Sequence, residues 1–216
     1  MTNMSDELVF YTNPMSRGRI VRWVLEEVGR PYRTELLDYG TTMKAPEYLR
    51  INPMGKVPAL RHGDTVVTEC AAICCYLANA FPDAGLAPAP RDRLRGSYYR
   101  WLFFAAGPLE AATTDKVLGL EVPADRKAMV GYGSLADAVA TLEAALAGRA
   151  YLVGDRFTAA DLYVGSYIGW GMRFGTMEKR PAFEPYVERL FARPAAVRAR
   201  EIDDALVPKD QRLGSG

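Results

Sequence analysis

Pro82-Asp83-Ala84-Gly85-Leu86-Ala87-Pro88-Ala89-Pro90 divides the chain into two parts of different character. The stretch holds three prolines and one glycine in nine residues, which is typical of a connection between two packing units. Strand-like and helix-like patterns alternate before it, whereas helix-like patterns dominate after it. We therefore expect two domains, over residues 1–82 and 91–216, joined by a linker over residues 83–90.

The part before this stretch predicts a mixed sheet with helices on its faces. An amphipathic helical pattern follows the first β-prone run and stops at Gly29, a residue suited to ending a helix. Arg61-His62-Gly63-Asp64 predicts a hairpin turn, because Gly63 can supply positive φ. The expected elements are a strand over 8–11, a helix over 20–28, a strand over 32–37, a loop or short helix over 38–50, strands over 57–60 and 65–68, and a helix over 70–81.

The part after the stretch predicts helices. Ala, Leu, Arg and aromatic residues are frequent there, and apolar residues recur at helical spacing. Thr158-Ala159-Ala160-Asp161 has the form of a capping box, in which the Thr158 and Asp161 side chains each accept from the amide of the other residue. The expected helices lie over 98–112, 136–146, 158–170, 183–192 and 195–202.

Composition places the chain among ordinary globular proteins and excludes several function classes. Its 216 residues are 49% hydrophobic and 25% charged, which rules out disorder. The 27 Lys and Arg nearly balance the 26 Asp and Glu, so no basic surface for nucleic acid or a membrane is expected. No apolar run approaches the ~20 residues of a membrane helix, and the start lacks an export signal. We expect a cytoplasmic protein.

Cysteine and histidine usage argues against disulfide, metal and triad chemistry. Cys70, Cys74 and Cys75 fall within six residues on one predicted helix, where mutual disulfides fit poorly. We expect them to be small packing residues. His62 is the one histidine, so neither a Ser-His-Asp triad nor a multi-histidine metal site is expected.

Three strings make the chain resemble the soluble, cytosolic-type glutathione transferases. They are Asn52-Pro53-Met54-Gly55-Lys56-Val57-Pro58-Ala59-Leu60, Glu69-Cys70, and Gly154-Asp155-Arg156-Phe157-Thr158-Ala159-Ala160-Asp161. The resemblance covers about residues 7–200 and is to bacterial-like members with a serine-type active-site loop. It implies an α/β plus all-α fold, in which a thioredoxin-like, glutathione-binding domain precedes an all-helical domain that contributes a hydrophobic substrate pocket. It also implies a homodimer and a cis Val57–Pro58 bond.

The resemblance assigns residues to the cysteinyl and γ-glutamyl parts of glutathione. Its cysteinyl backbone would pair with the backbone of Val57, before Pro58. Its γ-glutamyl carboxylate would meet the first amides of the helix at Cys70, and its ammonium would meet Glu69. Cys70 stands where the family has serine, and because a thiol is a poor donor, one hydrogen bond worth ~1 kcal/mol is lost.

Positive side chains are also expected around the ligand. Lys44 and Lys56 resemble family residues near the glycine carboxylate and the cysteinyl backbone, and Arg17 adds a cation near the thiol. Each lysine supplies a mobile point charge. For Lys44, a solvated surface lysine is the alternative, whereas Lys56 lies inside the closely matched string.

A thiol with a pKa near ~8.5 is mostly protonated at neutral pH, so the protein must stabilise the thiolate. In the family a Ser, Tyr or Cys after the first strand donates to it. We predict Ser16 for this role, with Tyr11, Asn13 or Thr12 as alternative donors. A plain helix N-cap is the other interpretation of Ser16. The loop has no cysteine, which disfavours the thiol-exchange subgroups.

The predicted function is glutathione transferase activity in detoxification, with glutathione as co-substrate and no metal. The thiolate would attack a hydrophobic electrophile or reduce a hydroperoxide. Aromatic and apolar residues that would line the electrophile pocket, or equally fill the core, are Met15, Tyr99, Phe103 and Phe104. The alternatives are a non-catalytic protein of this fold that binds ligands or proteins, and a glutathione-dependent isomerase.

Overall fold

The computed structural model describes residues 6–207, so residues 1–5 and 208–216 of the two expected domains lie outside the described residues. Packing divides the chain into two compact units. Within residues 6–207, one unit comprises the residues up to Ala84 together with those from Arg193 onward, and the other spans Gly85–Ala192. No helix within residues 6–207 is long and apolar enough to span a membrane.

A four-stranded mixed sheet forms the centre of the first unit, as the sequence predicts. Its strands are β1 (Leu8–Thr12), β2 (Arg33–Leu36), β3 (Ala59–His62) and β4 (Thr65–Thr68), in the order β2-β1-β3-β4. β1 runs parallel to β2 and antiparallel to β3, which forms a hairpin with β4 around Gly63 at φ 56°. The parallel pair requires a crossover connection, and the first helix supplies it.

Two long helices of the first unit pack against each other, and both begin at the predicted site segments. They are α1 (Gly18–Val28) and α3 (Cys70–Ala80), and the shorter elements are η2 (Thr42–Lys44), α2 (Pro46–Leu49) and η3 (Pro82–Ala84). α1 ends at Gly29, which has φ 68° and donates to Leu25 O, so this predicted stop is confirmed. The three cysteines of α3 form no disulfide among residues 6–207, and two of them, Cys70 and Cys74, are buried.

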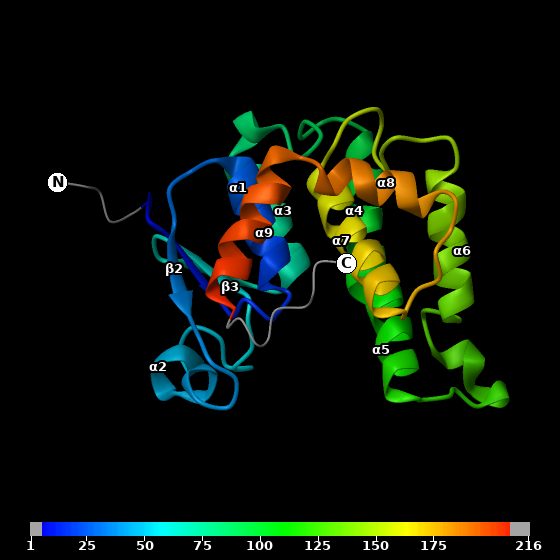
Figure 1. Cartoon of the computed structure of the whole chain (residues 1–216), viewed down its shortest axis with the longest axis horizontal. Coiled ribbons are helices and arrows are strands. Elements are labelled where there is room, and N and C mark those ends of the chain that lie inside the picture. The colour runs from blue at the N-terminus through cyan, green and yellow to red at the C-terminus, as the bar shows by residue number, and fades with distance from the viewer. Residues whose placement is uncertain (1–5, 208–216) are drawn as a thin grey trace. The chain divides into compact units, whose positions relative to one another are not determined.

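The last helix packs in the first unit, whereas the sequence analysis expects it in the second domain, over residues 91–216. α9 (Pro194–Leu206) lies along α1 in the first unit, although it follows the helical unit in the chain (Figure 1). Pro194 occupies the start of α9, where the missing N–H needs no partner. Oppositely charged side chains join the two helices at four places, which are Arg19–Asp204, Arg22–Asp203, Glu26–Arg198 and Glu27–Arg193.

The second unit is helical throughout, which confirms the predicted architecture. Its elements are α4 (Leu94–Phe104), η4 (Ala105–Leu109), α5 (Glu110–Leu118), η5 (Ala124–Met129), α6 (Leu135–Leu146), α7 (Ala159–Phe174) and α8 (Phe183–Phe191). The η4 segment is a π-helical turn containing Pro108, which has no N–H to continue the regular hydrogen-bond ladder.

The predicted capping box at the start of α7 is present. Thr158 and Asp161 bond reciprocally, and the buried Asp161 carboxylate also accepts from Leu152 N at 2.7 Å and from the Tyr186 hydroxyl at 3.0 Å. Burial raises the pKa of Asp161, and these hydrogen bonds oppose that shift. The carboxylate thus joins the start of α7 to the preceding loop and to α8.

Candidate functional site

The loop between β1 and α1 is held by its own side chains. Asn13 Oδ1 accepts from Met15 N at 2.9 Å, and Asn13 Nδ2 donates to Leu37 O at 2.8 Å. Ser16 Oγ donates to Asn13 O at 2.6 Å and accepts from Gly18 N at 2.9 Å. The predicted thiolate donor therefore lies at the start of α1, in a loop with few unused polar groups.

The geometry distinguishes the four predicted thiol donors. The one hydroxyl proton of Ser16 is used on Asn13 O, so Ser16 must rotate its hydroxyl to donate elsewhere. Both polar groups of Asn13 are used, and Thr12 is fully buried. The ring of Tyr11 packs beside that of Tyr48, with centroids 5.7 Å apart. Ser16 is half-buried and stands nearest the first amides of α1.

A second loop, over residues 52–57, presents the backbone of Val57. The Val57–Pro58 bond is cis, which agrees with the expectation from the family resemblance. Among residues 6–207, neither the N–H nor the C=O of Val57 has a hydrogen-bond partner. Both groups are therefore available to a ligand with an extended peptide backbone.

Side chains of this loop and of the segment before it hold three consecutive carbonyls of the loop. Lys44 Nζ donates to Met54 O at 3.2 Å and to Gly55 O at 2.9 Å. Lys56 O accepts from the Tyr48 hydroxyl at 2.5 Å and from Asn52 Nδ2 at 2.9 Å. Lys44 and Lys56 are exposed, whereas Tyr48 and Asn52 are each only 4% exposed.

The start of α3 brings the third predicted segment close to the first. Cys70 is buried, and its thiol donates to Arg17 O at 3.7 Å, so the starts of α1 and α3 are adjacent. Glu69 is exposed and has φ 65°, the one positive φ of a non-glycine residue within the described range. That backbone region costs about 1–3 kcal/mol for a residue with a side chain and is found preferentially at functional sites.

The residues predicted for an electrophile pocket belong to both units. Met15 is exposed in the β1–α1 loop of the first unit. In α4 of the second unit, Phe103 is 72% exposed, and the Tyr99 hydroxyl accepts from Arg95 Nη1 at 2.9 Å. Phe104 packs edge-to-face on Trp101, with ring centroids 5.5 Å apart, so it is partly a core residue. Of the three predicted pocket residues on α4, Tyr99 and Phe103 are exposed and Phe104 is half-buried.

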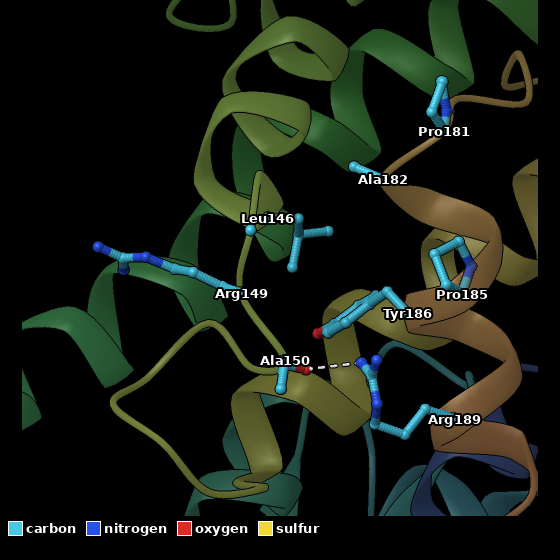
Figure 2. Close-up of a pocket in the computed structure, with 9 residues that line it drawn as sticks. Leu146, Arg149, Ala150, Pro181, Ala182, Pro185, Tyr186 and Arg189 are labelled. Atoms are coloured by element: carbon cyan, nitrogen blue, oxygen red, sulfur yellow. Dashed lines mark hydrogen bonds between the residues drawn. The ribbon is translucent and has the colours of Figure 1, made fainter.

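A cavity of about 350 Å³ in the second unit lies apart from all of these residues. It opens between the end of α6 and the start of α8, where Tyr186 and Pro185 face Leu146 (Figure 2). Arg189 Nη1 donates to Ala150 O at 3.1 Å on its rim, and the Arg149 side chain extends away from it (Figure 2). None of the predicted site residues lines this cavity.

Comparison with known proteins decides the family. The profile of the glutathione S-transferase N-terminal domain matches residues 15–80, and that of the glutathione S-transferase C-terminal domain matches residues 123–194. Glutathione S-transferase 3 of Zea mays is 31% identical over 201 residues, which cover 87% of this chain and 90% of the maize protein. The chain belongs to the glutathione transferase family.

Solved structures of other family members share the fold. A glutathione transferase from Methylococcus capsulatus is 30% identical with a TM-score of 0.76, and the match covers 93% of this chain and all of that one. A sphingomonad glutathione S-transferase, solved in complex with glutathione, is 27% identical with a TM-score of 0.75, over 90% of this chain and 98% of that one. The four-stranded mixed sheet followed by helices is therefore the glutathione transferase fold.

Two residues of this family member were not singled out from its sequence. Tyr48 and Asn52 lie in and just after α2, within a segment that the sequence predicts only as a loop or short helix. A buried tyrosine and a buried asparagine that donate to the same carbonyl have no spacing signature. The Asn-Pro pair at the head of the matched string was the one available signal, and it indicates a turn rather than a role for the amide.

Proposed function

We propose that the protein is a glutathione transferase that binds glutathione along the Val57 backbone and activates its thiol at the start of α1. The free N–H and C=O of Val57 carry the proposal, because together they match one residue of an extended peptide. The sphingomonad relative solved with glutathione supports the choice of ligand. Pro58 follows this residue and limits the loop to one backbone path.

The ends of the ligand would be held by charge. The first amides of α3, at Cys70, favour the γ-glutamyl carboxylate, and the exposed Glu69 carboxylate would meet the ammonium. At the other end, Lys44 uses two of its three N–H groups on loop carbonyls and keeps one for the glycine carboxylate. Lys56 is exposed and adds a second positive charge beside the loop.

The chemistry begins with removal of the thiol proton to solvent. The first amides of α1, the Arg17 charge and the Ser16 hydroxyl would favour the thiolate, since each unit of pKa depression needs ~1.4 kcal/mol. In conjugation, the sulfur forms a bond to an electrophilic carbon, and the leaving group departs with its electron pair. In hydroperoxide reduction, the sulfur attacks the distal oxygen, and a second glutathione closes the disulfide while alcohol and water are released.

Four residues would contribute apolar surface for the electrophile. They are Met15, the exposed α4 residues Tyr99 and Phe103, and the partly packed Phe104.

The proposal extends to a cytoplasmic homodimer with a detoxifying role, since twofold dimers are the commonest oligomers. Analytical ultracentrifugation measures the assembly directly.

Glutathione titration followed by thiolate ultraviolet absorbance across pH tests the proposal. We expect wild-type protein to lower the pKa of bound glutathione, and Ser16→Ala to return it toward the free value. Ser134→Ala is the matched control, because Ser134 caps α6 in the other unit. An unaffected Ser16→Ala protein would move the role to Tyr11 or Asn13, and absence of binding at millimolar glutathione would refute the proposal.

A second function, glutathione binding without transfer, is favoured by one observation. The Ser16 hydroxyl proton is used on Asn13 O, so no hydroxyl in the loop points freely toward a ligand sulfur. Such a protein would bind glutathione with an unshifted thiol pKa. It would also turn over neither aryl halides nor organic hydroperoxides, whereas the transferase would turn over at least one of these classes.

A further inference from the structure

In the peptide group between Lys56 and Val57, two side chains donate to the carbonyl, whereas the N–H is available to a ligand. Its carbonyl oxygen accepts from the Tyr48 hydroxyl at 2.5 Å and from Asn52 Nδ2 at 2.9 Å. Its N–H, which belongs to Val57, has no partner within residues 6–207. The two donors are 4% exposed, so water competes little for the carbonyl.

Peptide geometry links these two ends. The Lys56–Val57 bond is trans, and in a planar trans peptide the C=O and N–H point in opposite directions. Two donors that hold the carbonyl inward therefore turn the N–H outward, and loss of either donor lets the peptide plane rock. A bound ligand would then meet a less well oriented donor.

We propose that Tyr48 and Asn52 are positioning residues, whose hydrogen bonds to Lys56 O aim the Val57 N–H at the cysteinyl carbonyl of bound glutathione. This inference rests on the proposed function, because it assumes that Val57 pairs with that carbonyl. Neither side chain touches the ligand.

The surroundings of the two residues fit this role. Asn52 is itself fixed, because its Oδ1 accepts from Met54 N at 3.1 Å and its own N–H donates to Tyr48 O at 2.9 Å. Burial raises the pKa of Tyr48 to about 12, so the hydroxyl keeps its proton at neutral pH. Lys44 donates to the two preceding carbonyls, so side chains hold three consecutive carbonyls of this loop.

The test compares two ligands on three variants. Glutathione has the cysteinyl carbonyl, whereas γ-glutamylcysteamine keeps the γ-glutamyl group and the thiol but lacks it. We expect Tyr48→Phe, which keeps the ring packing, to bind glutathione about fivefold more weakly and γ-glutamylcysteamine as tightly as wild type. Asn52→Ala should behave in the same way. Tyr76→Phe, which removes a hydroxyl bonded to His62 Nδ1, is the matched control and should change neither affinity.

Ligand-free protein provides a second readout. The ¹⁵N relaxation order parameter of the Val57 amide should fall in Tyr48→Phe and stay unchanged in Tyr76→Phe. The inference is overturned if folded Tyr48→Phe binds glutathione like wild type, if it loses affinity equally for both ligands, or if its Val57 order parameter is unchanged. If Asn52→Ala fails to fold, Tyr48→Phe alone decides. If wild-type protein binds no glutathione, the proposed function is refuted. The order parameter of the Val57 amide in ligand-free protein still tests whether Tyr48 and Asn52 orient this amide.

Discussion

Arg22 of α1 and Asp203 of α9 form an ion pair in which Nε and Oδ1 are 2.7 Å apart and each side chain is 1% exposed. Arg22 Nη1 also donates to the Tyr32 hydroxyl at 3.2 Å and to Thr34 Oγ1 at 3.3 Å, on and beside β2. Arg22 Nη2 and Asp203 Oδ2 are buried and have no hydrogen-bond partner in the part of the chain that the structure describes. This pair joins α9 to α1, the helix at whose start the thiol site is proposed.

Truncation of one partner should be costly. We expect Asp203→Ala to lower the free energy of unfolding by about 3–5 kcal/mol, because the Arg22 charge stays buried without its carboxylate. Urea denaturation measures the loss. Arg198→Ala is the control, since Arg198 is half exposed in its pair with Glu26 and should contribute less than about 1 kcal/mol. Equal, small losses in both variants would contradict the expectation.

The same carboxyl should give a measurable pH dependence. Burial raises the pKa of Asp203 above its ordinary value of 3.8, although the adjacent Arg22 guanidinium opposes that shift. With a raised pKa in the folded state, the folded protein binds the proton more tightly than the unfolded protein does. The stability that this group contributes is therefore greatest below pH 3.8 and is lost as the pH rises through the raised value. We expect the unfolding free energy of wild type to fall over that window relative to the non-titrating Asp203→Asn. A rising difference would show that Arg22 outweighs burial.

Gly18 should resist substitution for a steric reason. A Cβ at this position would lie 1.9 Å from Thr12 Oγ1 and 2.9 Å from Ser16 Oγ. We expect Gly18→Ala to displace the β1–α1 loop, to cost about 1–3 kcal/mol of stability and to weaken glutathione binding. Gly96→Ala in α4 is the control, because nothing lies within 4 Å of its Cβ, and it should be neutral or stabilising by up to ~1 kcal/mol. Thermal melts and calorimetric titration compare the two variants.

Glu69 should show opposite effects on stability and binding. Its φ of 65° suits glycine, so Glu69→Gly should raise the free energy of unfolding by about 1 kcal/mol. The same change removes the carboxylate proposed to meet the ligand ammonium, so glutathione affinity should fall about tenfold. Glu69→Gln separates the two effects, because it keeps the strained backbone and removes the charge. Unaltered affinity in both variants would exclude Glu69 from the ligand site.

Most of the fold could be predicted from local patterns. The stop of α1 at Gly29, the hairpin around Gly63 and the capping box of Thr158 and Asp161 each depend on a few neighbouring residues, and all three are present. The packing of α9 could not be predicted in this way. Its partners on α1 lie more than 160 positions away along the chain, and charged residues at helical spacing look the same whether they face solvent or another helix.

For the candidate site too, local sequence patterns predicted some features and not others. The matched strings indicated Val57, Glu69 and Cys70, and in the structure the Cys70 thiol donates to Arg17 O, so the starts of α1 and α3 are adjacent. The direction of each hydrogen bond was beyond the sequence, including the use of the Ser16 proton on Asn13 O. The two donors to Lys56 O were also missed, because a side chain that acts through a carbonyl leaves no residue pattern at the carbonyl itself.

By itself, the sequence determined the order of strands and helices, the two-part architecture and the family, because periodicity, turn residues and short matched strings are local properties. Only the tertiary structure decided which unit holds α9, which donor protons are already used and which way the Val57 peptide faces. Those properties depend on contacts between residues that are distant in the chain, and such contacts form only when the chain folds.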